Sequence, residues 1–265
     1  MVSHLVRDVV TRLTRSAARS RPARMITDPA FVLGDFKASL PRRIPAGALV
    51  VDAGAGQCEQ RLPLSHTRYV GIDLAVGEAS WDYSRLDVIG DLTRLPVQNS
   101  VADAILCLQV LEHVPDPAAV IAEFSRVVKT GGKVYLSTPQ TWSQHQKPYD
   151  FYRYTSFGLR WLLEGHGFRI VQLEPVGGYF INLAVTLKGL PSVIRLPGSG
   201  DVFLIPLRTL LFPLLRIWFP IIAHFLDRLD EVRDYTIGYV VEAVRIVDSV
   251  PRDQGCSHVW DRSCR

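Results

Sequence analysis

Short hydrophobic runs separated by polar or glycine-rich turns dominate the middle of the chain. Residues 48–53 and 68–73 each read as a short buried strand, and each run has an aspartate at or next to its end. Two further apolar runs, at 100–108 and 133–139, have the same character. Runs of this length, rich in Val, Ile and Leu and bounded by turns, are typical of strands buried in a parallel sheet.

Helical spacing appears between and after these runs. Apolar residues recur at three- and four-residue intervals from Ala118 to Lys129, and we expect Gly131–Gly132 to end that helix. A second helix is expected from Thr155 to about Glu164, followed by strands at 165–173 and 236–246. The order of strands, turns and helices predicts an α/β fold with a doubly wound, mostly parallel sheet.

The first two runs carry the residues that an open α/β sheet uses to hold a nucleoside-containing cofactor. Gly54 and Gly56 follow Asp52 directly, and Asp73 ends the next run. In such a site the glycines let the backbone approach the ligand, and the second acid accepts from the ribose hydroxyls. A pyrophosphate turn needs a third glycine, and Glu59 would add negative charge at a helix start, so the pattern disfavours a dinucleotide.

This arrangement resembles the class I S-adenosylmethionine-dependent methyltransferases, whose first motif runs acid-x-Gly-x-Gly-x-Gly. Cys58 stands where that family usually has its last glycine, which puts the local loop geometry in question. The resemblance extends from about Ala48 to Gly178 and includes the family's Glu-His-Val-x-Asp-Pro signature at 112–117. It implies a Rossmann-like, seven-stranded sheet in the order 3-2-1-4-5-7-6, with an apolar helical insertion between the last two strands.

The resemblance also implies S-adenosyl-L-methionine as cofactor. In this family an acid in the third segment, here Asp91, accepts from the adenine amino group, and the next backbone amide, Leu92, meets a ring nitrogen. Gln109 either faces the methionine part of the cofactor or is a satisfied core amide. The implied cofactor-binding residues are Asp52, Gly54, Gly56, Asp73, Leu74, Asp91, Leu92 and Gln109.

The substrate side is expected after the fifth strand, because ligands bind beyond the carboxyl ends of the strands. Residues 145–155 resemble the His-x-x-Pro-x-Asp-x-x-Arg-Tyr-Thr pattern of a bacterial methyltransferase subgroup with largely unassigned substrates, which often accompanies envelope glycan or lipid genes. We expect His145 to act as general base on a hydroxyl acceptor, since an imidazole takes a proton near neutral pH. Tyr149 and Arg153 would position a carboxylate or phosphate on the acceptor.

Two of these assignments have structural alternatives of similar weight. Asp150 and Arg153 either serve the acceptor or pair with each other and brace the loop. His113 is either a catalytic base or a residue that fixes the entry to the following helix. Methyl transfer depends mostly on alignment and the exclusion of water, so the lack of an obvious catalytic dyad does not argue against an enzyme.

Composition narrows the class of protein. A chain of 265 residues can bury one good core with an appendage, and its mean hydropathy of +0.13 is somewhat apolar. Four cysteines without ligand spacing predict no metal site and a reducing compartment. No secretory signal is evident, so we expect a cytoplasmic protein. The net charge of +4 comes without a nucleic-acid-binding module, so no nucleic-acid partner is expected.

The sequence divides into a methyltransferase-like core and three flanking or inserted segments. We expect a basic amphipathic N-terminal helix or lid over 1–45, a core over 46–178 and 234–248, an apolar helical insertion over 179–233 and a polar tail over 249–265. The N-terminal helix suits either an anionic membrane surface or a lid over the cofactor.

The insertion contains an almost unbroken apolar run, Val202 to Leu226. Arg208, Arg216 and three prolines disfavour a membrane-spanning helix there. The run either docks on the inner face of the cell membrane, grips a lipid-linked acceptor, or packs on its own sheet or on a second copy in a homodimer.

Together these patterns predict an enzyme, a methyltransferase that acts on a hydroxyl or carboxyl of a small or lipid-linked cell-envelope metabolite. A quinone ring or a nitrogen acceptor is the alternative within the same class. The alternative from another class is a non-catalytic module that binds S-adenosylmethionine and recruits a partner through its apolar insertion.

Overall fold

The computed structural model describes residues 31–193, 206 and 211–246. The chain divides into two compact units, one formed by residues 1–35 and 175–237 and the other by residues 36–174 and 238–265. Each unit is considered by itself below. The predicted basic N-terminal helix up to residue 30, most of the residues from 202 to 210 and the polar tail lie outside the described residues.

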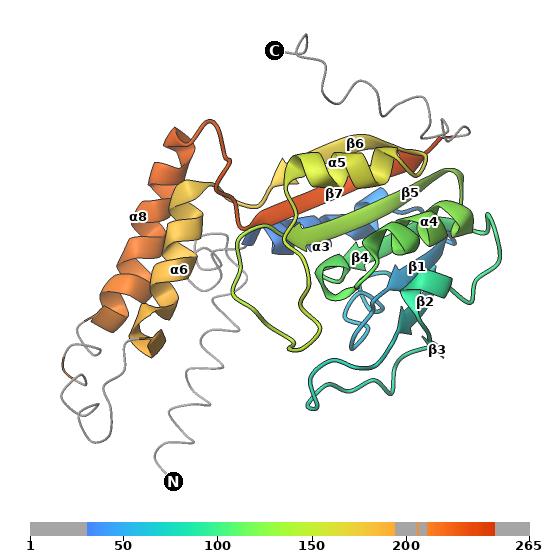
Figure 1. Ribbon diagram of the computed structural model, residues 1–265, viewed down its shortest axis with the longest axis horizontal. Helices are drawn as coiled ribbons and strands as arrows, with labels where there is room; N and C mark the ends of the chain where they lie inside the picture. The colour runs from blue at the N-terminus through green and yellow to red at the C-terminus, as the bar shows by residue number, and fades with distance from the viewer. Residues whose placement is uncertain (1–30, 194–205, 207–210, 247–265) are drawn as a thin grey trace. The chain divides into compact units, whose positions relative to one another are not determined.

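One seven-stranded sheet forms the larger unit, in the order β3-β2-β1-β4-β5-β7-β6, as the resemblance predicted (Figure 1). The pairs from β3 to β5 run parallel, and β7 runs antiparallel to β5. The strands are β1 (Leu49–Ala53), β2 (Arg68–Asp73), β3 (Val88–Ile89), β4 (Ala102–Leu108), β5 (Val128–Pro139), β6 (Phe168–Pro175) and β7 (Gly238–Arg245).

Helices cover both faces of this sheet. Val134 and Leu136 of β5 belong to a buried cluster with Phe124 of α4 and Leu159 of α5. Tyr135, which points the other way along the same strand, meets the ring of Phe36 in α3 at a centroid distance of 6.4 Å. The helical elements of this part of the chain are α3 (Phe31–Arg43), η1 (Leu92–Arg94), η2 (Leu111–His113), α4 (Pro117–Val127) and α5 (Ser156–Glu164).

The boundary between α4 and β5 differs from the prediction. The helix ends at Val127 and the strand begins at Val128, whereas the sequence pattern placed the helix up to Lys129 and the strand from Lys133. The pairing with β4 shifts register between Ala102 and Ala104, and Gly131 has a φ of +77°. The two glycines therefore lie in an irregular part of β5, which has more residues than β4 at this point, and they do not end the helix.

The sixth strand also starts later than predicted, at Phe168, because Gly165 is the C-cap of α5 and Gly167 has a φ of +81°. Between β1 and β2, residues 56–66 form a succession of turns. The sheet is thus the predicted one, with its irregularities at glycines.

The smaller unit contains α6 (Tyr179–Val193), the π-helical segment η4 (Leu214–Trp218), α8 (Phe219–Leu226) and η5 (Asp227–Leu229). The buried carboxylate of Asp227 accepts from the backbone N–H groups of Gly178 at 3.0 Å and Ile181 at 3.1 Å. Asp230 accepts from Tyr179 N–H at 2.6 Å. Two acids from the second half of the unit therefore close the N-terminus of α6, where the helix leaves donors unpaired.

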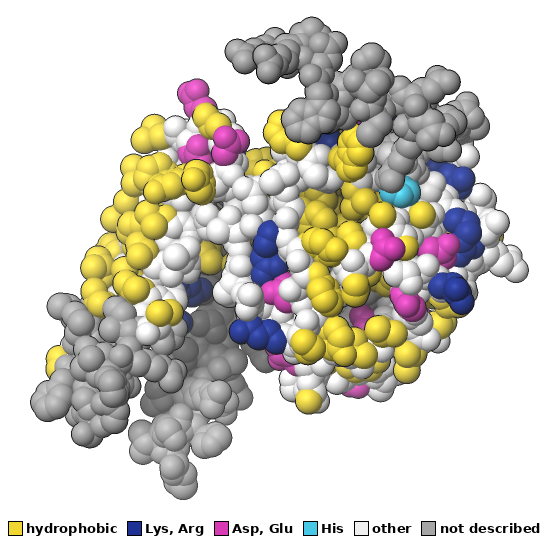
Figure 2. Space-filling model, viewed as in Figure 1, with side chains coloured by type: hydrophobic (Ala, Val, Ile, Leu, Met, Phe, Trp, Pro, Cys, Tyr) yellow, Lys and Arg dark blue, Asp and Glu magenta, His cyan; other side chains and the backbone are white. Residues whose placement is uncertain are grey.

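An apolar face remains exposed on this unit, visible as the yellow surface over α8 in Figure 2. No described helix is both long and apolar enough to cross a membrane. The side chains of this exposed apolar face are Phe212, Leu214, Ile217, Trp218, Ile222 and Phe225.

Candidate functional site

A cavity of about 650 Å³ lies where the strand order reverses between β1 and β4. Ligands of open α/β sheets bind at this position, beyond the carboxyl ends of the strands. The volume suits a nucleoside-sized ligand together with a small second molecule. The cavity brings together all eight predicted cofactor residues and three of the four predicted catalytic ones: Asp52, Gly54, Gly56, Asp73, Leu74, Asp91, Leu92, Gln109, His113, His145 and Tyr149.

The glycine turn after β1 is packed too closely to accommodate a side chain at Gly54. Gly54 has a φ of +84°, and a Cβ added there would lie 2.4 Å from the side chain of Val110. Gly56 has a φ of +51° and faces the ring of Trp81. Asp73 holds this turn in place, since its carboxylate accepts from Gly56 N–H at 2.9 Å and from Ala75 N–H at 2.7 Å.

Cys58 replaces the family's last glycine and keeps a glycine-like backbone. Its φ is +56°, a conformation that costs a side-chain-bearing residue energy. Its buried thiol donates to the carbonyl of Arg85 at 3.3 Å and packs against Gly71. The chain therefore has a positive φ at Cys58 together with a fully buried sulfur.

Asp52 is 4% exposed and accepts a hydrogen bond from the hydroxyl of Tyr69. Burial raises the pKa of Asp52 to about 6, and the Tyr69 bond and nearby Lys37 oppose that rise. Burial and the Asp52 charge raise the pKa of the Tyr69 hydroxyl, which stays the proton donor of the pair. The end of β1 therefore carries a carboxylate that is easily protonated.

Asp91 and Gln109 line the cavity, and each forms a side-chain hydrogen bond with a nearby residue. One oxygen of Asp91 accepts from Thr93 N–H and the Thr93 hydroxyl, each at 2.8 Å, so Asp91 caps η1 and also borders the cavity. Gln109 has a φ of +59° and donates from Nε2 to the hydroxyl of Ser137 at 3.2 Å. Non-glycine residues with positive φ are costly and are found preferentially at functional sites.

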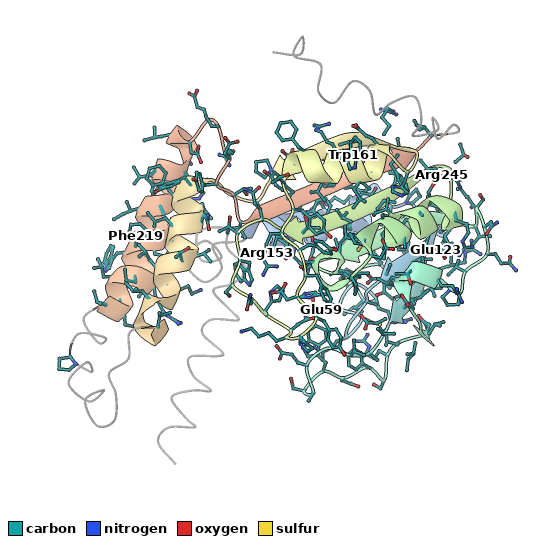
Figure 3. The ribbon with its side chains drawn as sticks, viewed as in Figure 1. Glu59, Glu123, Arg153, Trp161, Phe219 and Arg245 are labelled. Carbon is teal, nitrogen blue, oxygen red and sulfur yellow. The ribbon has the colours of Figure 1, made fainter. Side chains whose placement is uncertain are left out.

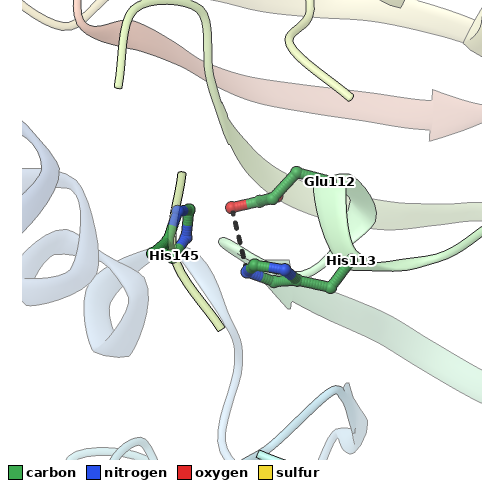
Figure 4. Close-up of side chains that lie close together, drawn as sticks. All are labelled: Glu112, His113 and His145. Atoms are coloured by element: carbon green, nitrogen blue, oxygen red, sulfur yellow. Dashed lines mark ion pairs between the residues drawn. The ribbon is translucent and has the colours of Figure 1, made fainter. Parts of the chain in front are cut away.

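The second group of polar residues, Glu112, His113 and His145, converges at the end of η2 (Figure 4). The Oε1 atom of Glu112 lies 3.9 Å from Nε2 of His113, and the rings of His113 and His145 meet edge-on at 4.7 Å. Glu112 is fully buried, and burial raises its pKa to about 8. Burial lowers the pKa of His113, which favours its neutral form.

Arg153 does not line the cavity; it braces the loop between β5 and α5 (Figure 3). Its guanidinium forms a bidentate pair with Asp150 at 2.7 and 2.9 Å. Its remaining donors reach the carbonyls of Trp142, Ser143 and Tyr152. This pair lowers the pKa of Asp150 and raises that of Arg153. All five N–H donors of the guanidinium therefore have acceptors within the loop.

Sequence reasoning overlooked two residues of this site. Trp81 and Glu112 both lie at or beside the cavity, yet only the family signature quoted Glu112 and nothing drew attention to Trp81. An aromatic residue soon after the second acid was the available signal for Trp81. The convergence of Glu112 with His145, more than thirty positions later, has no signal in spacing alone.

Comparisons with known proteins agree with this geometry. Residues 51–136 match the family described as a methyltransferase domain. A ubiquinone biosynthesis O-methyltransferase from Hahella chejuensis is 36% identical over 117 residues, which are 44% of this chain and 44% of that protein. The chain thus spans less than half the length of the curated relatives it matches.

Two solved structures share the fold at low identity. One is a chain of the complex between the Haloferax volcanii Trm112 methyltransferase activator and a methyltransferase, with 17% identity, a TM-score of 0.52 and coverage of 88% of this chain and 97% of that one. The other is the 1,6-didemethyltoxoflavin-N1-methyltransferase of Burkholderia thailandensis, with 16% identity, a TM-score of 0.50 and coverage of 92% and 90%.

The sheet order, the glycine turn with its two acids, and the matched domain define a nucleoside-cofactor site of the Rossmann-like methyltransferase class. Residues 51–136 form a methyltransferase domain, and the sheet has the strand order of the class I S-adenosylmethionine-dependent methyltransferase fold. Its residues fit that cofactor: Gly54 and Gly56 line the cavity with backbone that carries no side chain, and the carboxylates of Asp73 and Asp91 keep lone pairs for hydroxyl and amino donors.

The strain at Cys58 predicts an unusual order of stability for two variants. We expect Cys58→Gly to be more stable than Cys58→Ala, by about 1 kcal/mol, because both lose the buried sulfur but only glycine relieves the positive φ. Urea denaturation of the two variants measures the difference. Equal stability, or greater stability of the alanine variant, would show that the backbone at Cys58 is not strained.

The raised pKa of Asp52 predicts a pH-dependent gain from its amide analogue. The folded state holds the Asp52 proton up to about pH 6 and the unfolded state only up to about 3.8, so wild-type stability falls as pH rises through that window. At pH 8 we expect Asp52→Asn to unfold with a free energy higher by about 2 kcal/mol, with the gap closing below pH 4. Urea denaturation across pH 4 to 8 tests this, and a constant gap would contradict it.

Proposed function

We propose that this protein transfers the methyl group of S-adenosylmethionine to a hydroxyl of a small or lipid-linked metabolite. One observation carries the proposal: a single cavity is lined both by the cofactor acids Asp52, Asp73 and Asp91 and by the imidazoles of His113 and His145. A cofactor-sized region and proton-accepting side chains in one enclosure suit an acceptor that must lose a proton. The name of the O-methyltransferase relatives supports a hydroxyl acceptor.

When bound, S-adenosylmethionine supplies a methyl group on a sulfonium that is a good leaving group. The task of this chain is to align the acceptor and keep water away. Asp73 and the turn at Gly56 would hold the ribose, while Asp91 and the amide of Leu92 would hold the adenine. Tyr149, which is 43% exposed at the cavity, would border the acceptor.

A phenolic ring hydroxyl, as on a quinol precursor, is the acceptor that the relatives' name favours over a carboxyl or a nitrogen. Arg153 has its donors engaged within its own loop, which speaks against a role in gripping an acceptor carboxylate. The remaining alternative is a module that binds the cofactor without catalysis.

The exposed apolar face of the smaller unit supports a lipid-linked acceptor. Trp218, at the end of η4, is 60% exposed, and Phe225, in α8, is 59% exposed. Large apolar patches on a protein surface mark sites of interaction with lipids or other proteins. We propose that this face lies on the membrane surface and gives the enzyme access to an acceptor with an apolar tail.

Asp73→Asn tests the cofactor assignment. The amide has one oxygen where the carboxylate uses two, so we expect at least about a tenfold loss of affinity for S-adenosylmethionine and S-adenosylhomocysteine in calorimetric titration. Asp82→Asn, on the same connection but outside the cavity lining, is the matched control and should bind as the wild type does.

The acceptor is tested with a short-chain prenyl catechol and the matching prenyl aniline, using methyl-labelled cofactor. Label in the catechol alone supports the hydroxyl proposal, and label in the aniline alone contradicts it. No transfer to either, nor to envelope-lipid extract, by a protein that binds the cofactor would favour the non-catalytic module. No cofactor binding in a folded sample would overturn the site itself.

The membrane proposal predicts sedimentation with anionic vesicles. We expect the double substitution Trp218→Ser and Phe225→Ser to lower the bound fraction several-fold, because the apolar face loses its largest side chains. Phe157→Ser is the control, since Phe157 is 81% exposed on α5 of the larger unit. A wild-type protein that stays in the supernatant would exclude membrane docking.

A further inference from the structure

Glu112 is a buried acid whose carboxylate lacks hydrogen-bond partners among the described residues. Its side chain is fully buried, and neither carboxylate oxygen has a hydrogen-bond partner there. Burying a carboxylate without a partner is strongly unfavourable, and native proteins place such groups where a ligand or an ion completes them. The backbone carbonyl of Glu112, in contrast, accepts hydrogen bonds from the N–H groups of Phe151 and Tyr152. The backbone at Glu112 is therefore fixed by hydrogen bonds, whereas its two carboxylate oxygens have no hydrogen-bond partner among the described residues.

His113 presents a lone pair to the same spot. Its Nδ1 lies 2.5 Å from the carbonyl of Tyr149, and a carbonyl can only accept, so Nδ1 carries the proton. The other ring nitrogen, Nε2, is then unprotonated, has no partner among the described residues, and lies 3.9 Å from Glu112 Oε1. A backbone carbonyl that fixes the tautomer in this way is the usual outer partner of a metal-binding histidine.

The ring of His145 is likewise oriented by a contact between Nδ1 and a backbone carbonyl. Its Nδ1 lies 3.1 Å from the carbonyl of Ser143 and 3.6 Å from Asp150 Oδ2, which Arg153 holds. With the proton on Nδ1, the Nε2 atom of His145 also keeps a lone pair. The loop that Arg153 braces is therefore the element that supplies the third group.

The three groups are close enough to share one ion. One ligand atom from each of Glu112, His113 and His145 lies within 4.8 Å of the others. Ligands of a tetrahedral zinc ion stand about 3.4 Å apart, given metal–ligand distances near 2.1 Å. Small side-chain rotations would close the difference, and Figure 4 shows the groups converging on one space.

We infer that Glu112, His113 and His145 form a binding site for a divalent transition-metal ion of the zinc type. Two imidazoles and one carboxylate are the ligand set of zinc sites that keep an open coordination position. Magnesium prefers oxygen ligands, so two nitrogen ligands disfavour it. The sequence-based prediction of no metal site rested on the spacing of the four cysteines, whereas this inference concerns one carboxylate and two imidazoles.

The open position of such an ion would face the cavity, because His113 and His145 also line it. A hydroxyl bound there would be held beside the cofactor region and would lose its proton more readily. That consequence rests on the proposed function, whereas the metal site itself does not. In this role His145 is a ligand, not the general base that the sequence suggested.

The test is metal binding by the full-length protein after removal of metals with a chelator. Competition with a chromophoric chelator should show one tight Zn²⁺ equivalent, and Co²⁺ should give visible absorption bands of nitrogen coordination. Glu112→Gln and His145→Ala should each weaken Zn²⁺ binding at least about tenfold. His66→Gln, an exposed histidine outside the cavity, is the control and should leave binding unchanged.

Wild-type binding no tighter than that of Glu112→Gln or His145→Ala would overturn the inference, as would displacement of Co²⁺ by excess Mg²⁺. His145→Ala changes a half-exposed loop residue, so the test does not depend on Glu112→Gln folding. Calorimetry with S-adenosylmethionine in chelator separates the two proposals. Cofactor binding without Zn²⁺ binding refutes the metal site alone, and Zn²⁺ binding without cofactor binding refutes the proposed function alone.

Discussion

The shape of the cofactor region depends on the hydrogen bonds that the Asp73 carboxylate accepts from the backbone. It accepts from the backbone of Gly56 on one side and of Ala75 on the other, while Gly54 and Ala55 donate to the carbonyl of Ile72. Three of these hydrogen bonds, donated by Gly54, Ala55 and Gly56, therefore fasten the glycine turn to the end of β2. Because the side chain has lone pairs left over, the same group can shape the wall and still meet a ribose.

Most of the fold follows from local pattern. The bounds of β2 agree with its apolar run to the residue, because runs of Val, Ile and Leu between turns specify buried strands. The order of the strands was implied by the resemblance alone, and the sheet agrees with it. The predicted boundary between α4 and β5 was wrong, because glycines that end helices also permit irregularities in strands. Which of the two occurs depends on pairing with β4, a non-local contact that the local sequence does not contain.

The candidate site likewise contains residues that the sequence predicted and residues that it did not. The structure brings the predicted acids and glycines together because they sit at the ends of adjacent strands, a placement fixed by topology. The acceptor side was harder: whether Arg153 faces a ligand or its own loop depends on the path of residues 140–155 in space. The burial of Glu112 without a partner was beyond sequence reasoning, because it results from how η2 packs under that loop.

The position of β7 has a consequence for how the chain reaches its native state during synthesis. β7 lies between β5 and β6 in the sheet, yet it follows both of them and the whole of residues 175–237 in the chain. Until residues 238–245 leave the ribosome, β5 and β6 each have an unpaired edge and no hydrogen bonds to one another. These two edges can associate with other chains until β7, the last of the described strands, is made and covers both.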